Sequence, residues 1–369
     1  MRILVFSLIA LIIGCAKKQP KNMLEVALAS KNQKIKVVME NLDQHEVQVQ
    51  FSEVIRDSAG TASFIDYHFQ VDDSIYFYPA SSVKFPIAIL ALEKLNEQDD
   101  FNRNSKFYVE GDSIESTFSD EIIKIFAVSD NAANNRLFEF LGKDDINRRL
   151  TEKGLAARIS HRLSVENSDE LTTKPLIFYL NDSTTTPTEE LVSTPIEPLQ
   201  LDRLEKGKGY KKGDSLIMKS KDFSLKNYLP LSSLHSIMKR IIFPELFPEE
   251  QRFHLSKDDR KFLLNSMKIL PKEAGYDPNE FNDSYVKFFL FGDVKDAIPN
   301  HIEIYNKVGY AYGYLTDCAY IRNIKTDKEY IISATIHVIK NQIYNDDTYE
   351  YESLGIPFLA ELGRQLVDK

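Results

Sequence analysis

The arrangement of strand-like and helix-like segments along the 369 residues most constrains the fold. Alternating apolar residues favour strands between residues 47 and 77. β-Branched and aromatic residues favour a hairpin of segments 306–323 and 329–338, joined by a turn at 325–327. The middle of the chain begins with a helix, over residues 83–95, that is apolar around most of its circumference. Strands at both ends around a helical middle predict an antiparallel sheet assembled from both chain ends and packed against helices, an α/β or α+β fold.

Other segments have helical periodicity, and one long segment shows little pattern. Helices are expected over residues 23–44, 119–127, 132–153 and 352–367. The segment from about 173 to 300 contains polar runs and aromatic-proline stretches, with helix candidates at 232–241 and 258–269.

The N-terminus has the layout of a secretory signal, with Arg2, a short apolar run over residues 3–13, and Gly14-Cys15. A membrane span needs about 20 apolar residues, so the run is too short for one. Ile12-Ile13-Gly14-Cys15 resembles the lipobox of bacterial lipoproteins, in which the cysteine is acylated. We therefore expect a signal peptide over 1–14, a tether over 15–22, and a membrane-anchored lipoprotein in the cell envelope, on the periplasmic or outer surface of a bacterial membrane. A secreted protein with a chance cysteine is the alternative.

Cysteine count, charge and histidine spacing exclude several classes of protein. Cys318 is the only cysteine after Cys15, so the mature chain forms no intramolecular disulfide. The net charge of −9 argues against nucleic acid as a partner. The seven histidines form neither a His-x-His nor a His-Glu-x-x-His spacing, so no metal and no cofactor is expected.

Ser81 lies where a strand-like segment and Pro79 give way to the apolar helix. A serine at a helix N-terminus has free backbone N–H groups and the positive end of the dipole beside it. Lys84 returns to the same face one turn later, and burial would lower the pKa of its amine. The pair therefore fits a nucleophile and its base, the alternative being a capping serine with an exposed lysine.

The same Ser-x-x-Lys spacing occurs twice more. Ser236 and Lys239 fall inside a predicted helix, whereas Ser284 and Lys287 fall at a strand-like, aromatic run over residues 285–290. Neither copy lies at the start of a helix, so context favours the first copy as the nucleophile.

Two further short motifs carry polar side chains. Ser129-Asp130-Asn131 interrupts two helical stretches, where its hydroxyl and amide can relay a proton and hold a substrate carbonyl or amide. Lys307-Val308-Gly309 begins the C-terminal hairpin, where the lysine supplies positive charge and the glycine allows substrate to approach the strand closely. Each motif alone fits a helix cap or an ordinary strand equally well.

In their order, the three motifs resemble the Ser-x-x-Lys, Ser-Asp-Asn and Lys-Thr-Gly set of class A β-lactamases and penicillin-binding proteins. The flanking sequences, Pro79 to Ala88 and Val128 to Asn134, extend the resemblance. It implies a β-lactamase-like fold over residues 23–369, with a helical subdomain beside the sheet. The segment 173–300 looks like an insertion, as in a lipoprotein-type branch of the family.

The resemblance implies a role for each motif residue. Ser81 would be the acylated nucleophile and Lys84 its base or proton relay. Ser129 would pass a proton to the leaving nitrogen, Asn131 would position the acyl amide, and Lys307 would stabilise substrate charge.

The third motif departs from the family at Val308, which replaces a hydroxyl residue that meets the substrate carboxylate. A lost charge-assisted hydrogen bond is worth about 1.5–3 kcal/mol, so weaker binding of ordinary β-lactams is expected. The oxyanion hole would combine the backbone N–H groups of Ser81 and of Tyr310, which follows Gly309.

Class A enzymes release the acyl group with a glutamate on a loop, in a Glu-x-x-Leu-Asn setting. Residues 161–171 occupy the corresponding stretch, but the full setting is absent. Glu166 is the preferred candidate for the base and Glu170 the next, with solvated loop carboxylates as the alternative. Without a placed base, Ser81 would be acylated and the chain would act as a penicillin-binding protein.

The leading hypothesis is a serine β-lactamase-like hydrolase that opens β-lactams or related amides through an acyl-Ser81 intermediate. A peptidoglycan peptidase or esterase of the same superfamily is the alternative among enzymes. A catalytically idle lipoprotein that binds a glycan or a partner is the alternative from another class. The expected partners are a β-lactam or peptidoglycan-like small molecule and the membrane, and the oligomeric state is left open.

Overall fold

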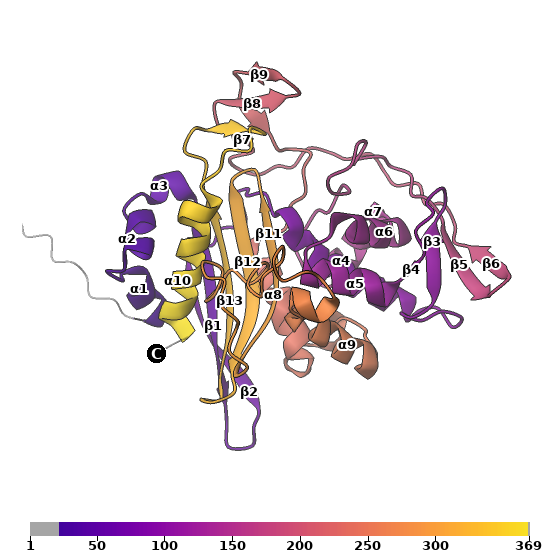
Figure 1. Ribbon diagram of the computed structural model, residues 1–369, viewed down its shortest axis with the longest axis horizontal. Helices are drawn as coiled ribbons and strands as arrows, with labels where there is room; N and C mark the ends of the chain where they lie inside the picture. The colour runs from indigo at the N-terminus through magenta and orange to yellow at the C-terminus, as the bar shows by residue number, and fades with distance from the viewer. Residues whose placement is uncertain (1–21, 368–369) are drawn as a thin grey trace, which may run out of the picture.

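The main sheet joins the two ends of the chain in the computed structural model, which describes residues 22–367 (Figure 1). Within that range it has five antiparallel strands in the order β11, β12, β13, β1, β2. Their bounds are β1 (Gln48–Arg56), β2 (Ala62–Phe69), β11 (Ile302–Ala311), β12 (Tyr314–Asn323) and β13 (Lys328–His337). The N-terminal β1 pairs with the C-terminal β13, placing Phe51 opposite Ile332. The predicted sheet from both chain ends is confirmed.

Helices cover both faces of this sheet (Figure 1). One side carries α1 (Met23–Leu28), α2 (Gln33–Met39), α3 (Leu42–His45) and α10 (Ile356–Val367), and the other carries α8 (Leu231–Ile242). α10 buries Leu359, Leu362 and Leu366, which recur at helical spacing on one stripe. Because both faces are covered, β12 and β13 are buried along most of their length.

The remaining helices form a second layer beside the α8 face, around the central α4 (Lys84–Leu95). They are α5 (Phe118–Ala127), α6 (Asn131–Leu141), α7 (Lys143–Glu152) and α9 (Lys257–Lys268). Every residue of α4 except Lys94 is buried, as its all-round apolar sequence predicts. Asp130 caps α6 by accepting the backbone N–H of Ala133 at 2.8 Å, which fixes the corner between α5 and α6.

Four sequence predictions need correction. Residues 23–44 form separate short helices, because Asn32 caps α2 through the N–H of Lys34. The segment 132–153 is divided at Gly142 into α6 and α7, and 306–323 is divided by a turn into β11 and β12. The run 285–290 is not a strand, because a buried carboxylate binds its backbone N–H groups in place of a neighbouring strand.

The segment 173–300 contributes to both the core and the periphery. Helices α8 and α9 supply core residues such as Leu234 and Leu263. Its strands lie at the far right and the top of the molecule (Figure 1). β5 (Leu176–Asn181) and β6 (Thr184–Pro187) form one small sheet with β3 (Lys106–Val109) and β4 (Ser116–Thr117). β7 (Glu205–Lys206) pairs with β10 (Lys221–Asp222) in a second sheet. β8 (Gly209–Lys212) and β9 (Ser215–Ile217) form a third sheet with β14 (Ile343–Tyr344).

The proposed signal peptide and Cys15 lie outside the described residues. Within residues 22–367, no helix combines the length and the apolar character that a membrane crossing requires. The lipid anchor therefore stays a prediction from the sequence.

Candidate active site

Ser81 lies in a tight 3₁₀ turn, η1 (Ala80–Val83), that leads directly into α4. Ala80 has a φ of 47°, a left-handed conformation that is uncommon outside glycine and is often found at functional sites. Ser82 fixes the turn, since its N–H and its hydroxyl donate to the Pro79 carbonyl at 3.1 and 2.7 Å. Ser81 is half-buried, and its hydroxyl makes no hydrogen bond to any residue of the described range. The turn thus presents a free hydroxyl at the mouth of α4.

Lys84 is fully buried and faces the corner between α5 and α6. Its Nζ donates to the Ser129 carbonyl, to Asn131 Oδ1 at 2.6 Å and to Ser129 Oγ at 3.3 Å. Burial lowers the pKa of Lys84 to about 7, against the attraction of Asp130. An amine with this pKa is partly neutral at physiological pH and can act as a general base.

Within the described residues, Lys84 Nζ makes no hydrogen bond to the Ser81 hydroxyl. All three N–H donors of a protonated Lys84 have acceptors in the Ser129–Asn131 corner. Transfer of the Ser81 proton therefore requires Lys84 to lose its own proton and release one of these acceptors.

Ser129 connects two buried lysines. It adopts a left-handed φ of 58°, and its Oγ accepts from Lys307 Nζ at 2.8 Å as well as from Lys84. Lys307 also donates to the Val308 carbonyl at 2.8 Å. Burial, together with the charge of Lys84, holds the pKa of Lys307 well below its usual range. The first, second and third motifs therefore meet at one hydroxyl group.

Gly309 packs against the backbone of the Ser81 turn. β11 is an edge strand of the sheet, and its neighbour on the free side is η1. A Cβ atom on Gly309 would lie 2.5 Å from the Pro79 carbonyl oxygen, 2.7 Å from the Ser82 nitrogen and 3.0 Å from the Ser81 nitrogen. We expected substrate to use the space beside Gly309, but the Ser81 turn fills it. The glycine is therefore required for the close approach of this turn to β11.

Comparison with known proteins agrees with the overall fold. Residues 19–192, which include the first two motifs, match the model of the beta-lactamase enzyme family. The structure of L2 complexed with relebactam is 12% identical, covers 93% of this chain and 97% of that chain, and has a TM-score of 0.50. The chain has a beta-lactamase-like fold.

A second solved structure has a similar extent of match to this beta-lactamase-like chain. It is a beta-lactamase from Sphaerobacter thermophilus DSM 20745, with 12% identity, a TM-score of 0.49, and coverage of 93% of this chain and 94% of that chain. No curated protein matches the sequence. The predicted β-lactamase-like fold is confirmed by the match to the L2 structure.

Val308 is the point at which this beta-lactamase-like chain departs from the family motif. Its side chain is fully buried within the apolar cluster that also contains Leu315 and residues of α10. The valine therefore contributes to core packing and provides no hydrogen-bond donor next to Lys307. Tyr310, two positions on, is 45% exposed and lies against Phe288 and Tyr351, with ring centroids 6.2 and 5.6 Å away.

The structure does not bring Glu166 into contact with the lysines. Glu166 and Glu170 are both exposed, and neither carboxylate has a hydrogen bond or ion pair within residues 22–367. The loop is held instead by Ser164, whose Oγ accepts from Asn131 Nδ2 at 2.9 Å, and by Arg162, which donates to the Glu170 carbonyl at 2.9 Å. The candidate site therefore has an anchored loop at this position but no anchored carboxylate.

The motifs did not reveal a buried polar group that lies beside Lys307. It consists of Lys287, Asn306 and Asp317, which come from the irregular run 285–290, from β11 and from β12. A signal was present in the sequence, because Lys287 and Asp317 interrupt runs whose other members predict burial. A charged residue in such a run has to find a partner inside the protein.

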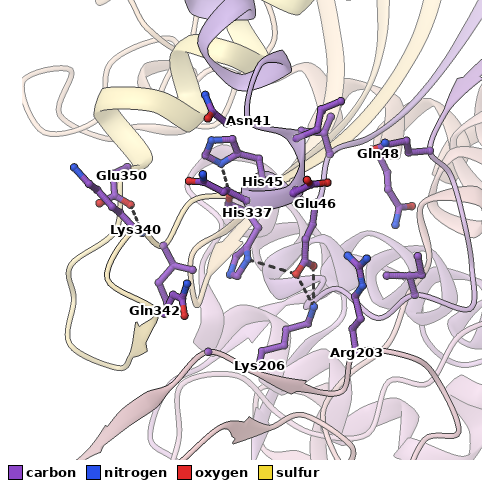
Figure 2. A pocket seen from close by; sticks show the side chains of 18 of the residues that line it. Asn41, His45, Glu46, Gln48, Arg203, Lys206, His337, Lys340, Gln342 and Glu350 are labelled. Atoms are coloured by element: carbon purple, nitrogen blue, oxygen red, sulfur yellow. Dashed lines mark hydrogen bonds and ion pairs between the residues drawn. The ribbon is translucent and has the colours of Figure 1, made fainter. Parts of the chain in front are cut away.

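A cavity of about 1240 Å³ lies apart from the three motifs. It is lined by the α2–α3 connection, by β7 and by the end of β13, and contains no motif residue. Figure 2 shows Glu46 pointing toward Lys206 and His337 in its wall. The Glu46 carboxylate accepts from Lys206 Nζ at 2.8 Å and from the Tyr314 hydroxyl at 2.8 Å. Glu46 thus has hydrogen-bond partners in the cavity wall. Because no motif residue lines the cavity, it is separate from the site at Ser81.

Proposed function

We propose that the protein is a class A-like serine hydrolase that forms an acyl-enzyme on Ser81 with β-lactams or related amides. The observation that carries the proposal is the convergence of Lys84 and Lys307 on Ser129 Oγ, with Lys84 at the start of the helix that follows the Ser81 turn. In the proposed reaction Ser81 is the nucleophile, Lys84, whose pKa is lowered to about 7, is its base, and Ser129 is the proton relay.

The reaction follows from these positions. Neutral Lys84 Nζ takes the Ser81 proton, and Ser81 Oγ attacks the carbonyl carbon of the amide. The carbonyl oxygen becomes an oxyanion, for which the N–H groups of Ser81 and Tyr310 are the proposed donors. The C–N bond then breaks as Ser129 gives its proton to the leaving nitrogen, and protonated Lys84 restores the proton of Ser129. Ser81 is left as an ester.

Substrate binding would depend on Lys307 and Asn131. Lys307 has one N–H donor beyond those that contact Ser129 and Val308, which suits an anionic group on the substrate. Asn131 would hold the acyl amide after exchanging its contact with Ser164 or Lys84. The buried Val308 adds no polar contact, so ordinary β-lactams should bind weakly.

The exposed positions of Glu166 and Glu170 favour a second candidate, a penicillin-binding function in which release is slow. Hydrolysis of the ester at Ser81 needs a water molecule and a group that removes its proton. A loop carboxylate without contacts to Lys84 or Asn131 is poorly placed to hold such a water. Acylation would then outpace release, and a peptidoglycan-like amide would be the natural substrate.

We also propose that the chain is exported and anchored in the bacterial cell envelope through an acyl group on Cys15. Support comes from the sequence Ile12-Ile13-Gly14-Cys15 after a short apolar run. Labelling of expressing cells with a radioactive fatty acid tests this. The wild-type chain should take up label and Cys15→Ser should not, whereas equal labelling or none in both would contradict the anchor.

The acyl-enzyme is tested with a fluorescent penicillin and a chromogenic cephalosporin added to the full chain. A covalent adduct on the Ser81 peptide supports the proposal, whether it turns over or persists. Release of product without an accumulating adduct identifies a true hydrolase. An adduct that accumulates and persists identifies the penicillin-binding function. Neither adduct nor product would contradict the proposal.

A further inference from the structure

The hairpin of β8 and β9 projects from the top of the molecule, beyond the end of the main sheet (Figure 1). β8 pairs in parallel with β14, and β9 is the edge strand of this three-stranded sheet. The segment 206–222, which contains the hairpin, has six lysines and two aspartates, a net charge of +4 in a chain whose net charge is −9. An acidic protein thus carries a strongly basic projection.

The lysines at the base of the hairpin have partners on the body of the protein. Lys206 Nζ lies 2.8 Å from the carboxylate of Glu46. Lys221 Nζ lies 5.0 Å from the centroid of the Tyr312 ring and 5.2 Å from that of Tyr210, within the range of cation–π attraction. These two lysines therefore attach the hairpin to the body.

The hairpin has an inner and an outer face. Tyr210 lies opposite Ile217, and Lys211 lies opposite Leu216. Because neighbouring residues of a strand point to opposite sides, the two pairs lie on different faces. Tyr210 and Ile217 are half-buried on the inner face, and Lys211 is exposed on the outer face. Leu216 and Met218, which share the outer face, are 53% and 65% exposed.

Four further lysines of the segment are exposed, and their ammonium groups form no ion pair or hydrogen bond within residues 22–367. They are Lys208, Lys211, Lys212 and Lys219. The chain contains 55 acidic residues, so partners for these lysines are not scarce. The hairpin therefore combines unpaired positive charge with exposed apolar side chains.

Protection of the sheet edge does not account for this combination. Lysines on an edge strand do prevent pairing with other chains, but exposed apolar residues on the same strand promote association. A soluble anionic polymer would bind the lysines and leave Leu216 and Met218 in water. A bilayer with anionic lipids suits both kinds of side chain, because lysines bind its headgroups and apolar residues enter the boundary between headgroups and acyl chains.

We propose that the outer face of the β8–β9 hairpin is a peripheral membrane contact for bilayers that contain anionic lipids. Each exposed lysine near such a surface strengthens binding by roughly fivefold. The contact depends neither on acyl transfer at Ser81 nor on the lipid anchor at Cys15. It would fix the orientation of the protein on the bilayer.

The experiment uses tryptophan fluorescence, because the chain contains no tryptophan. Met218→Trp is made in the full chain together with Cys15→Ser, so that no acyl group is attached. The chain is mixed with vesicles of phosphatidylglycerol and phosphatidylcholine in equal parts, or of phosphatidylcholine alone. With the anionic vesicles the emission should move to shorter wavelength, and brominated acyl chains should quench it.

Ile324→Trp in the same Cys15→Ser chain is the matched control, since Ile324 is 50% exposed. It lies between β12 and β13, whereas β8 pairs with β14, which follows the other end of β13. Its emission should stay unchanged with both kinds of vesicle. Thermal unfolding at pH 7 checks the fold of each variant, and Leu216→Trp replaces Met218→Trp if that variant fails to fold.

The charge contribution is measured by adding Lys211→Gln, Lys212→Gln and Lys219→Gln together to the Met218→Trp chain. Binding to the anionic vesicles, followed by the shift in emission, should weaken by about a hundredfold.

A shift that requires both phosphatidylglycerol and the three lysines would support the proposal. No shift, an equal shift with neutral vesicles, or an equal shift in Ile324→Trp would overturn it. Soluble polyphosphate that binds the hairpin as tightly as the anionic vesicles would also overturn it, because the lysines would then serve an anionic polymer. None of these results alters the test of acylation at Ser81.

Discussion

The three-motif cluster and the 161–171 loop differ sharply in how their polar groups are held. In the cluster, Lys84 and Lys307 are buried and both donate to Ser129 Oγ. In the loop, Glu166 and Glu170 are exposed, and their carboxylates make no contact with the described residues. Side chains that are held by hydrogen bonds need less reorganisation to act on a substrate than solvated side chains do.

The difference separates the two halves of the expected reaction. In the proposed reaction, the groups that acylate Ser81 come from the α5–α6 corner, from β11 and from the start of α4. The carboxylates proposed to assist hydrolysis of the ester, Glu166 and Glu170, have no comparable hydrogen bonds within residues 22–367. We therefore expect fast formation and slow loss of the acyl-enzyme.

Ser81→Ala should have the largest effect, because Ser81 is proposed as the nucleophile. Ser82, the other serine of the turn before α4, already donates its hydroxyl to the Pro79 carbonyl. Complete loss of the covalent adduct is expected, measured by intact-protein mass spectrometry after incubation with a penicillin. Ser236→Ala, in the second Ser-x-x-Lys copy, is the control and should keep the adduct. An adduct on Ser81→Ala would place the nucleophile elsewhere.

Lys84→Met should slow acylation by about 10²- to 10⁴-fold, the usual contribution of a general base. The wild-type rate should fall as pH drops below about 7, because protonated Lys84 cannot accept the Ser81 proton. The variant should lose this dependence, as seen in acylation rates between pH 5 and 9. A pH profile that is the same in both chains would remove Lys84 as the base.

Gly309→Ala should slow acylation by roughly a hundredfold, because its Cβ would meet the Pro79 carbonyl at 2.5 Å and move the Ser81 turn from β11. Stopped-flow kinetics measures the acylation rate, and thermal unfolding checks that the variant folds. A variant that folds and acylates at the wild-type rate would show that the close contact has no role in the reaction.

Glu166→Gln and Glu170→Gln should have the smallest effects, with deacylation rates within about twofold of the wild type, because a solvated loop carboxylate contributes little positioned base catalysis. The decay of a preformed fluorescent acyl-enzyme measures both variants. A fall of a hundredfold or more in either one would reverse the comparison and identify the missing base.

The sequence predicted most of the fold, because its periodic segments are long. The apolar helix after Ser81 and the β-branched C-terminal strands were both recognised from local pattern. The order of the three motifs along the chain selected Ser81, Lys84, Ser129 and Lys307 as candidate site residues. The sequence did not predict that Gly309 packs against the Ser81 turn, since this contact joins residues more than 200 positions apart.

The run 285–290 shows why other features were missed. Its aromatic and β-branched residues favour a strand, yet Asp317 binds the backbone N–H groups of Phe288 and Phe289. A tertiary contact therefore overrides the local preference. The buried group of Lys287, Asn306 and Asp317 depends on the same contact, so its formation could not be derived from spacing alone.

The lifetime of the Ser81 adduct tests the central claim most directly. The full chain is mixed with an excess of benzylpenicillin, because weak binding is expected, and intact mass is followed from seconds to hours. Our account predicts a stoichiometric adduct on Ser81 that forms within minutes and persists for many times longer than it took to form. Complete hydrolysis of excess benzylpenicillin without an accumulated adduct would contradict it, because release would then be faster than acylation.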